Sequence, residues 1–117
     1  MSFRNTNENY TSVNNAFSRD KALEPATIGI LFVILSNDPH WTVYPEEIAT
    51  RLGISRTTVD RHFKILEKAG YMRTLRFNLK NRGGSIVRRL FSDIPITDVF
   101  FEYWKSRVEK EVLDDTN

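Results

Sequence analysis

The spacing of apolar residues in the middle of the chain predicts two short helices joined by a tight turn. Ile48, Ala49 and Leu52 fall at i, i+1 and i+4, which places them on one helical face. Gly53 can end this helix because glycine adopts the left-handed conformation at low cost. Ser55 is a favourable N-cap for the next helix, because its hydroxyl can accept a backbone hydrogen bond. A helix, a turn and a second helix are therefore expected.

The second of these helices is amphipathic. Val59, Phe63 and Leu66 lie within about one third of its circumference at ~100° per residue, and Gly70 ends it. The opposite side is polar and largely cationic, with Thr57, Asp60, Arg61, Lys64 and Lys68. One face is thus expected in the core and the other in solvent.

An earlier helix is expected over residues 24–36, because Glu24-Pro25 places proline at an early helical position. Ile28, Leu31 and the apolar residues between and after them make this helix apolar on nearly every side. Such a helix is buried on more than one face. The additional cover is expected from the C-terminal segment or from a second chain.

After Gly70 the apolar period changes to two, which predicts β-strands over residues 71–79 and 85–91. The glycines of Gly83-Gly84 suit the turn between them, because they tolerate a positive φ. A β-hairpin is therefore expected directly after the second helix. The extended stretch that begins with Trp41 and Val43 could pair with it.

A last helix is expected over residues 98–113, with Thr97 as its N-cap. Its apolar stripe consists of Phe100 or Phe101, Trp104, Val108 and Val112, and the expected packing residues are Phe100, Phe101, Trp104 and Val108. This helix either completes the core of its own chain or forms a homodimer. The dimer is the preferred hypothesis, because two half-sites let short recognition helices reach useful specificity.

The whole pattern predicts a mostly helical α+β fold with a three-helix core, a β-hairpin and an extra C-terminal helix. A length of 117 residues fits one domain. Residues 1–15 are polar and asparagine-rich, so they are expected to form a mobile arm. Residues 16–95 are expected to form the folded domain, and residues 96–117 the C-terminal helix and tail.

The central motif resembles a helix-turn-helix of the winged-helix type. The residues that carry the resemblance are Glu47, Ile48, Ala49, Leu52-Gly53-Ile54-Ser55, Thr58-Val59, Arg61, Leu66-Glu67 and Ala69-Gly70-Tyr71. The resemblance implies that the hairpin is the wing and that the second helix of the motif enters double-stranded DNA.

A narrower resemblance covers residues 10–95, through Tyr10, Phe17, Asp20, Leu23, Ile30-Leu31, Leu35-Ser36, Pro39 and Trp41. It is to the N-terminal winged-helix domain of phage and plasmid replication initiators and replisome organisers. That family implies binding of origin DNA, with replication proteins as further partners. Two alternatives stay open: a stand-alone transcriptional regulator that works with transcription proteins, and a protein-interaction winged helix without DNA binding.

The charge distribution favours DNA binding over protein interaction alone. The net charge is only +2, yet residues 51–92 carry eleven Lys and Arg against Asp60 and Glu67, a local net charge of +9. A block of this kind points to an anionic partner, and a phosphate backbone is the most direct one.

The sequence lacks the residues that a metal site or an enzyme active site would need. There is no cysteine, and His40 and His62 lack metal-ligand spacing, so neither a metal site nor a cofactor is expected. No acid–base or nucleophile pair emerges, so the chain is not expected to be an enzyme. The sequence has no apolar run of transmembrane length and no signal peptide, which makes a cytoplasmic protein the expectation.

The N-terminal turn of the recognition helix is expected to meet base edges through Ser55, Arg56, Thr57 and Thr58. Arg56 is the expected base reader, and Arg61 and Lys64 are expected to contact bases or phosphates. Asp60 could accept a hydrogen bond from a cytosine amino group. The favoured interpretation is that Asp60 pairs with a cation at i±4, either Arg56 or Lys64, and orients it.

The hairpin is expected to supply the remaining DNA contacts. Lys80 and Arg82 at its tip should reach the adjacent minor groove, where a narrow groove attracts cations. Arg73, Arg76 and Arg88 on its strands should contact the phosphate backbone.

Overall fold

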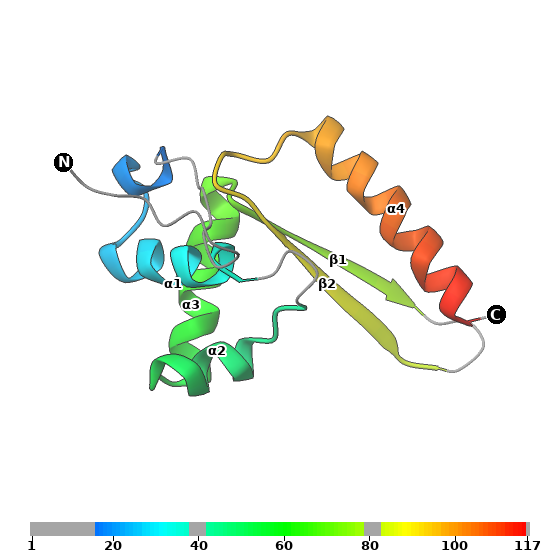
Figure 1. The fold of residues 1–117 in the computed structure, drawn as a ribbon, viewed down its shortest axis with the longest axis horizontal. Coiled ribbons are helices and arrows are strands. Elements are labelled where there is room, and N and C mark those ends of the chain that lie inside the picture. Colours follow the sequence, from blue (N-terminus) through cyan, green and yellow to red (C-terminus); the bar gives the residue numbers. More distant parts are fainter. Residues whose placement is uncertain (1–15, 38–41, 79–82, 117) are drawn as a thin grey trace, which may run out of the picture.

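The computed structural model describes residues 16–37, 42–78 and 83–116. The elements are a 3-10 helix η1 (Phe17–Arg19), helices α1 (Pro25–Leu35), α2 (Pro45–Leu52), α3 (Arg56–Ala69) and α4 (Asp98–Thr116), and strands β1 (Met72–Asn78) and β2 (Ser85–Phe91) (Figure 1). This confirms the expected fold class, a mostly helical winged helix with an extra C-terminal helix. The expected arm at residues 1–15, Trp41, and the hairpin-tip residues Lys80 and Arg82 lie outside the described residues.

Local chemistry sets the ends of the two central helices. Gly53 follows α2 with φ 67°, and Gly70 follows α3 with φ 94°, so both occupy the left-handed region that favours glycine. Between the helices, the backbone N–H of Thr58 donates to Ser55 Oγ at 3.1 Å. The helix-turn-helix geometry predicted from this segment is therefore confirmed.

The core forms around the apolar face of α3. Val59 and Leu66 on that face are fully buried, as are Leu31 of α1 and Ile48 of α2. The buried ring of Phe17 extends the same cluster. Because α3 packs against α1, α2 and β1, its opposite face is left to point outward.

A buried polar pair also connects α1 to α3. Thr27 is fully buried, His62 is only 2% exposed, and Thr27 Oγ1 lies 2.7 Å from His62 Nδ1. The hydrogen bond offsets the cost of removing both groups from water. His62 is thus a structural residue inside the core.

The hairpin has two different faces, set by its antiparallel register. On one face, Met72 joins the main core, and Phe91 packs edge-to-face on Phe63 of α3 with ring centroids 5.3 Å apart. The sheet contains only β1 and β2 within the described residues, so the expected pairing of Val43 with the hairpin is wrong there. Val43 is buried, and its carbonyl oxygen accepts a hydrogen bond from the Arg89 side chain instead.

Helix α4 covers the other face of the hairpin. It lies beside β1 and far from α1 (Figure 1). Arg73 of β1 joins the two elements: its Nη1 donates to Asp98 Oδ1 at 3.0 Å, and its guanidinium lies 4.0 Å from the centre of the Phe101 ring. Leu75 and Val108 are buried but lie outside the main core cluster, as expected for a second, smaller contact region.

One of the two alternatives for the C-terminal helix is therefore wrong, because it does not fold back onto α1, where Phe32 stays 52% exposed. The expected apolar stripe is present with Phe101, since Phe101, Trp104 and Val108 share the hairpin side, whereas Phe100 is 48% exposed. The physical reason is that strand alternation gives the hairpin a second apolar face. This face lies close to α4 in the sequence, and α4 packs against it rather than against α1.

The buried histidine predicts a pH dependence of stability. Burial, with the nearby Arg61 as a second cause, lowers the pKa of His62 from its ordinary value of 6.5. The unfolded chain therefore takes up this proton first as the pH falls. The free energy of unfolding should be fully retained above pH 6.5 and should decrease below it, down to the pKa of the folded state.

Urea denaturation at about pH 7.5 and about pH 5 tests this expectation. The His62→Gln variant is the control, because it keeps His40 and every carboxylate. Its stability should change less between the two pH values than that of the wild type. An equal change in both proteins would assign the pH dependence to other groups.

Candidate nucleic-acid interface

The outward face of α3 presents a short row of polar and cationic side chains. Thr57, Lys64 and Lys68 are exposed on it. At its N-terminal end, Ser55 Oγ lies 2.8 Å from Thr58 Oγ1 and also accepts the backbone N–H of Thr58. The hydroxyls of Ser55 and Thr58 thus hold the helix cap, while Thr57 is directed to solvent.

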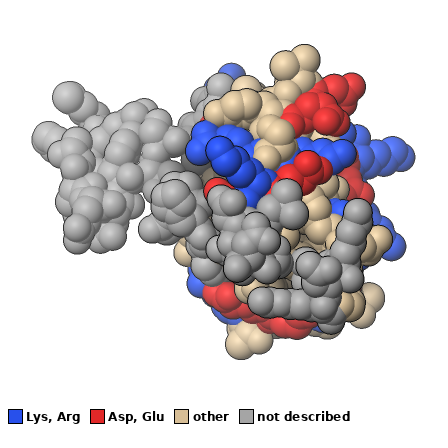
Figure 2. Space-filling view, turned by 90° about the vertical axis from the view of Figure 1, so that its right-hand side faces the viewer, with Lys and Arg blue, Asp and Glu red and all other residues tan. Residues whose placement is uncertain are grey.

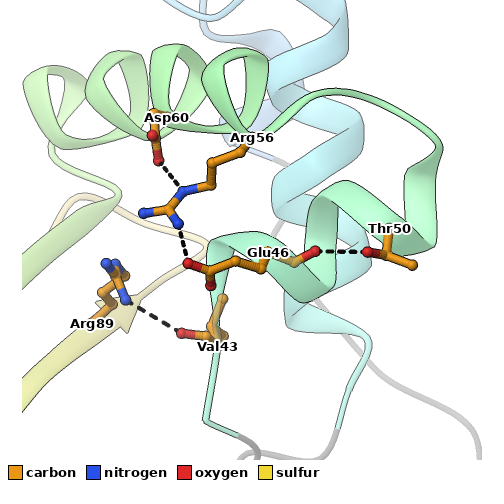
Figure 3. A network of polar contacts seen from close by, with 6 residues as sticks. All are labelled: Val43, Glu46, Thr50, Arg56, Asp60 and Arg89. Carbon is orange, nitrogen blue, oxygen red and sulfur yellow. Dashed lines mark hydrogen bonds and ion pairs between the residues drawn. The ribbon is translucent and has the colours of Figure 1, made fainter.

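Arg56, the expected base reader, is held by two carboxylates. Its Nε donates to Asp60 Oδ1 at 3.0 Å, and its Nη1 pairs with Oε1 of Glu46 on α2 (Figure 3). The hydrogen bond with Asp60 is the main cause that raises the pKa of Arg56. The expected pairing of Asp60 with a cation one turn away is therefore confirmed, and its partner is Arg56.

Arg61 is held in a similar way on the other flank of α3. Its Nη1 donates to Oε2 of Glu24, directly before α1, at 2.7 Å. Its Nη2 lies 3.3 Å from Nε2 of the buried His62. More than half of the Arg61 side-chain surface is still exposed, so the guanidinium is ordered by these contacts while remaining accessible.

The cations of the hairpin divide between its two faces. Arg73 points toward α4, where Asp98 and Phe101 hold it. Arg76 is exposed on the face that is turned toward α3, and Arg88 is half-buried on the α4 side. Lys80 and Arg82 lie outside the described residues.

Arg89 is a candidate residue that the sequence analysis missed. It shares a hairpin face with Phe91, which packs on α3, and this period of two was the signal that could have found it. Its Nη1 donates to the carbonyl oxygen of Val43 at 3.5 Å. Burial, together with the positive charges of Arg56 and Arg76, lowers the pKa of Arg89.

Lys and Arg side chains alternate with Asp and Glu side chains on the described surface seen in Figure 2. Ion pairs also place carboxylates beside Arg56, Arg61 and Arg73. The local net charge of residues 51–92 therefore does not produce one uninterrupted basic patch, because acidic residues from α2, α4 and the segment before α1 lie among the arginines.

A pocket of about 350 Å³ opens where the beginnings of α2 and α3 meet β2. Its lining includes Tyr44, Glu46, Arg56, Ser85, Arg88 and Arg89.

Among the described residues, no cluster of histidines and carboxylates has the composition of a metal site. In that same part of the chain, no helix combines the length and apolarity that a membrane span requires.

Comparisons with known proteins bear mainly on the helix-turn-helix segment. Solved structures that are similar include a possible transcriptional regulator from Methanosarcina mazei Go1, with 18% identity, 81% of each chain covered and a TM-score of 0.46. Another is a transcriptional regulator homologue from Pyrococcus horikoshii OT3, with 23% identity, coverage of 86% of this chain and 92% of that one, and a TM-score of 0.43. No curated protein matches the chain.

Residues 29–83 match the family model described as "HTH domain". The matched range contains most of α1, all of α2, α3 and β1, and the beginning of the hairpin turn. This match fits the winged helix-turn-helix fold seen in the structure, in which the hairpin directly follows α3.

Proposed function

We propose that this protein binds double-stranded DNA, with α3 in the major groove and the hairpin against the neighbouring backbone. The observation that carries the proposal is the division of α3 into a buried apolar face and an exposed polar face with Thr57, Lys64 and Lys68. A major groove is about 12 Å wide and admits such a helix. The cationic hairpin follows α3 directly. In this proposal its charges therefore lie beside the same groove.

In this proposal the candidate residues divide into base readers and backbone contacts. Thr57 and Arg56 read base edges from the first turn of α3, and Asp60 orients the Arg56 guanidinium. Arg61 and Lys64 contact bases or phosphates along the same helix. Arg76, Arg88 and the tip residues Lys80 and Arg82 contact the backbone.

The biological role in this proposal is control of replication initiation or of transcription, in the cytoplasm of its host. Both roles use the same contacts with duplex DNA, so the interface does not separate them. The resemblance of residues 10–95 to phage and plasmid initiators is the reason for considering origin DNA, whereas the match to the helix-turn-helix model is compatible with either role. Genome-wide mapping of bound sites distinguishes the two, because an initiator concentrates at an origin and a regulator at promoters.

A second candidate function is protein interaction without DNA binding. The observation that favours it is that Arg56 and Arg61 on the recognition helix both have carboxylate partners within the chain. Such pairs are exposed, however, and exposed ion pairs contribute little free energy. A phosphate can therefore displace the carboxylates, and DNA binding is the better supported function.

We also propose that a second copy of the chain covers the outer face of α4. Val99 is 83% exposed, and Phe100 and Tyr103 beside it are about half-exposed. At ~100° per residue, Val99 and Tyr103 lie opposite the side that packs on the hairpin and Phe100 lies between the two sides, so one helix can make both contacts. A two-fold dimer would present two recognition helices to two half-sites.

The first prediction from this function concerns Arg56. Replacing Arg56 by Ala should weaken binding to the matched site by roughly 10-fold and should relax the preference at one base pair. The measurement is the dissociation constant for the matched duplex and for its single-base variants. Lys110→Ala on α4 removes one exposed cation from another surface and should leave the affinity nearly unchanged. An equal loss across all duplexes would mean that Arg56 contacts only phosphate.

The second prediction concerns the hairpin tip. If about six phosphates are neutralised, log K should fall with log salt at a slope of about −5. Replacing both Lys80 and Arg82 by Ala should make that slope less steep by at most about two. The double variant Lys105→Ala, Lys110→Ala changes the net charge equally on α4 and is the control. If the slope of log K against log salt is the same in the two double variants, the hairpin tip lies away from DNA.

The third prediction concerns the dimer. Val99→Glu adds a charge to the exposed apolar face of α4 and should convert the protein to a folded monomer. Binding to a two-half-site duplex should then weaken more than binding to a single half-site. Phe32→Glu, at an exposed aromatic of α1, is the control. Light scattering measures the mass, and a wild-type monomer at tens of micromolar would contradict the dimer.

A further inference from the structure

The pocket between α2, α3 and β2 is unusually rich in arginine. Arg56, Arg88 and Arg89 all line it, and Glu46 is the single carboxylate in its lining. The guanidinium groups of Arg56 and Arg89 and the carboxylate of Glu46 face the same space (Figure 3). The Arg88 side chain belongs to the α4 face of the hairpin. Arg56 and Arg89 therefore face the pocket with Glu46, which leaves one more positive than negative charge among these side chains.

Arg89 is the least satisfied of these cations. Within the described residues it has no salt bridge, and its hydrogen bond to the Val43 carbonyl oxygen has the limiting length of 3.5 Å. A guanidinium offers five N–H donors and stays charged in proteins. Partial burial beside Arg56 and Arg76 therefore leaves Arg89 with donors that an anion in the pocket would satisfy.

The Glu46 carboxylate is the anion that now pairs with Arg56 in this pocket. Its carboxylate binds Arg56, yet its side chain is 65% exposed and belongs to the first turn of α2. Such an exposed pair exchanges readily with a stronger ligand. A DNA phosphate has two non-bridging oxygens and can therefore accept hydrogen bonds from Arg56 and Arg89 at once.

We propose that this pocket binds one phosphate of the DNA backbone through Arg89 and the Nη1 group of Arg56, and that Glu46, which pairs with this Nη1, competes with the phosphate, while Nη2 of Arg56 stays available to a base edge. This inference rests on the proposed function and adds two residues to it. Arg89 anchors the backbone at the junction of recognition helix and hairpin. Glu46 weakens binding to every duplex by the same factor, so it lowers non-specific affinity while the base contacts keep their discrimination.

Glu46→Gln tests the competition. It keeps the size and hydrogen-bonding capacity of the side chain but removes its charge, so it should tighten duplex binding by about threefold to tenfold. The slope of log K against log salt should steepen by up to about one, because one more cation becomes available to phosphate. Glu47→Gln is a matched control: it removes the neighbouring charge of the same helix turn, whose partner is Arg51 rather than Arg56.

Arg89→Gln tests the anchor, in the wild-type chain and together with Glu46→Gln. It should weaken duplex binding on its own and should remove most of the gain from Glu46→Gln, because both changes act on one phosphate. Arg89→Lys keeps the charge but loses the two-pronged geometry, so the salt slope should persist while the affinity falls. Thermal unfolding of each variant shows that it is folded before its affinity is compared.

The outcomes separate this inference from the proposed function. Equal gains from Glu46→Gln and Glu47→Gln, or an unchanged affinity in folded Arg89→Gln, would overturn the inference while leaving DNA binding intact. No duplex binding by either wild type or Glu46→Gln would overturn both. Titration with inorganic phosphate distinguishes the source: saturable binding of free phosphate that a duplex does not displace would assign the pocket to a small anion instead of DNA.

Discussion

The structure depends on burying one face of α3. Val59 and Leu66 lose all contact with water there, and Phe63 nearly all, against residues from α1, α2 and the hairpin. Each fully buried side chain of this size contributes about 1.5–3 kcal/mol relative to an exposed one. Because the helix has a period of 3.6 residues, fixing this face in the core also fixes which residues point outward. The outward polar face of α3, which is the proposed recognition surface, is thus a direct consequence of the core.

The residues that begin and end α3 also fix how this helix is oriented relative to the hairpin. Ser55 begins the helix with a side-chain hydrogen bond, and the left-handed Gly70 ends it before the chain turns into β1. The hairpin then packs back through Phe91 on Phe63. As a result, the strands that carry Arg76 and Arg89 lie next to the first turn of α3, where Arg56 is located.

Electrostatic pairing determines how the basic residues are presented. Glu46, Glu24 and Asp98 come from outside the basic segment 51–92, yet each holds one of its arginines. Exposed pairs of this kind are weak, so they orient the guanidinium groups but leave them able to bind another anion. In the proposed complex, a phosphate backbone replaces these carboxylates at a small cost in free energy. The affinity for DNA then depends on the acidic neighbours as well as on the arginines.

The sequence by itself determined the elements and their order. The ends of α2 and α3, the strands of the hairpin and the helix after Thr97 follow from local rules of spacing, capping and glycine conformation, which act within a few residues. The pairing of Asp60 with a cation one turn away was predictable for the same reason, but the structure decided that the partner is Arg56 and not Lys64. Only the tertiary structure decided that α4 covers the hairpin and leaves Phe32 of α1 exposed, because two apolar faces competed for one helix. It also decided that Glu46 and Arg89 meet Arg56 in one pocket, since that encounter depends on how α2 and β2 pack around α3, and no local pattern encodes it.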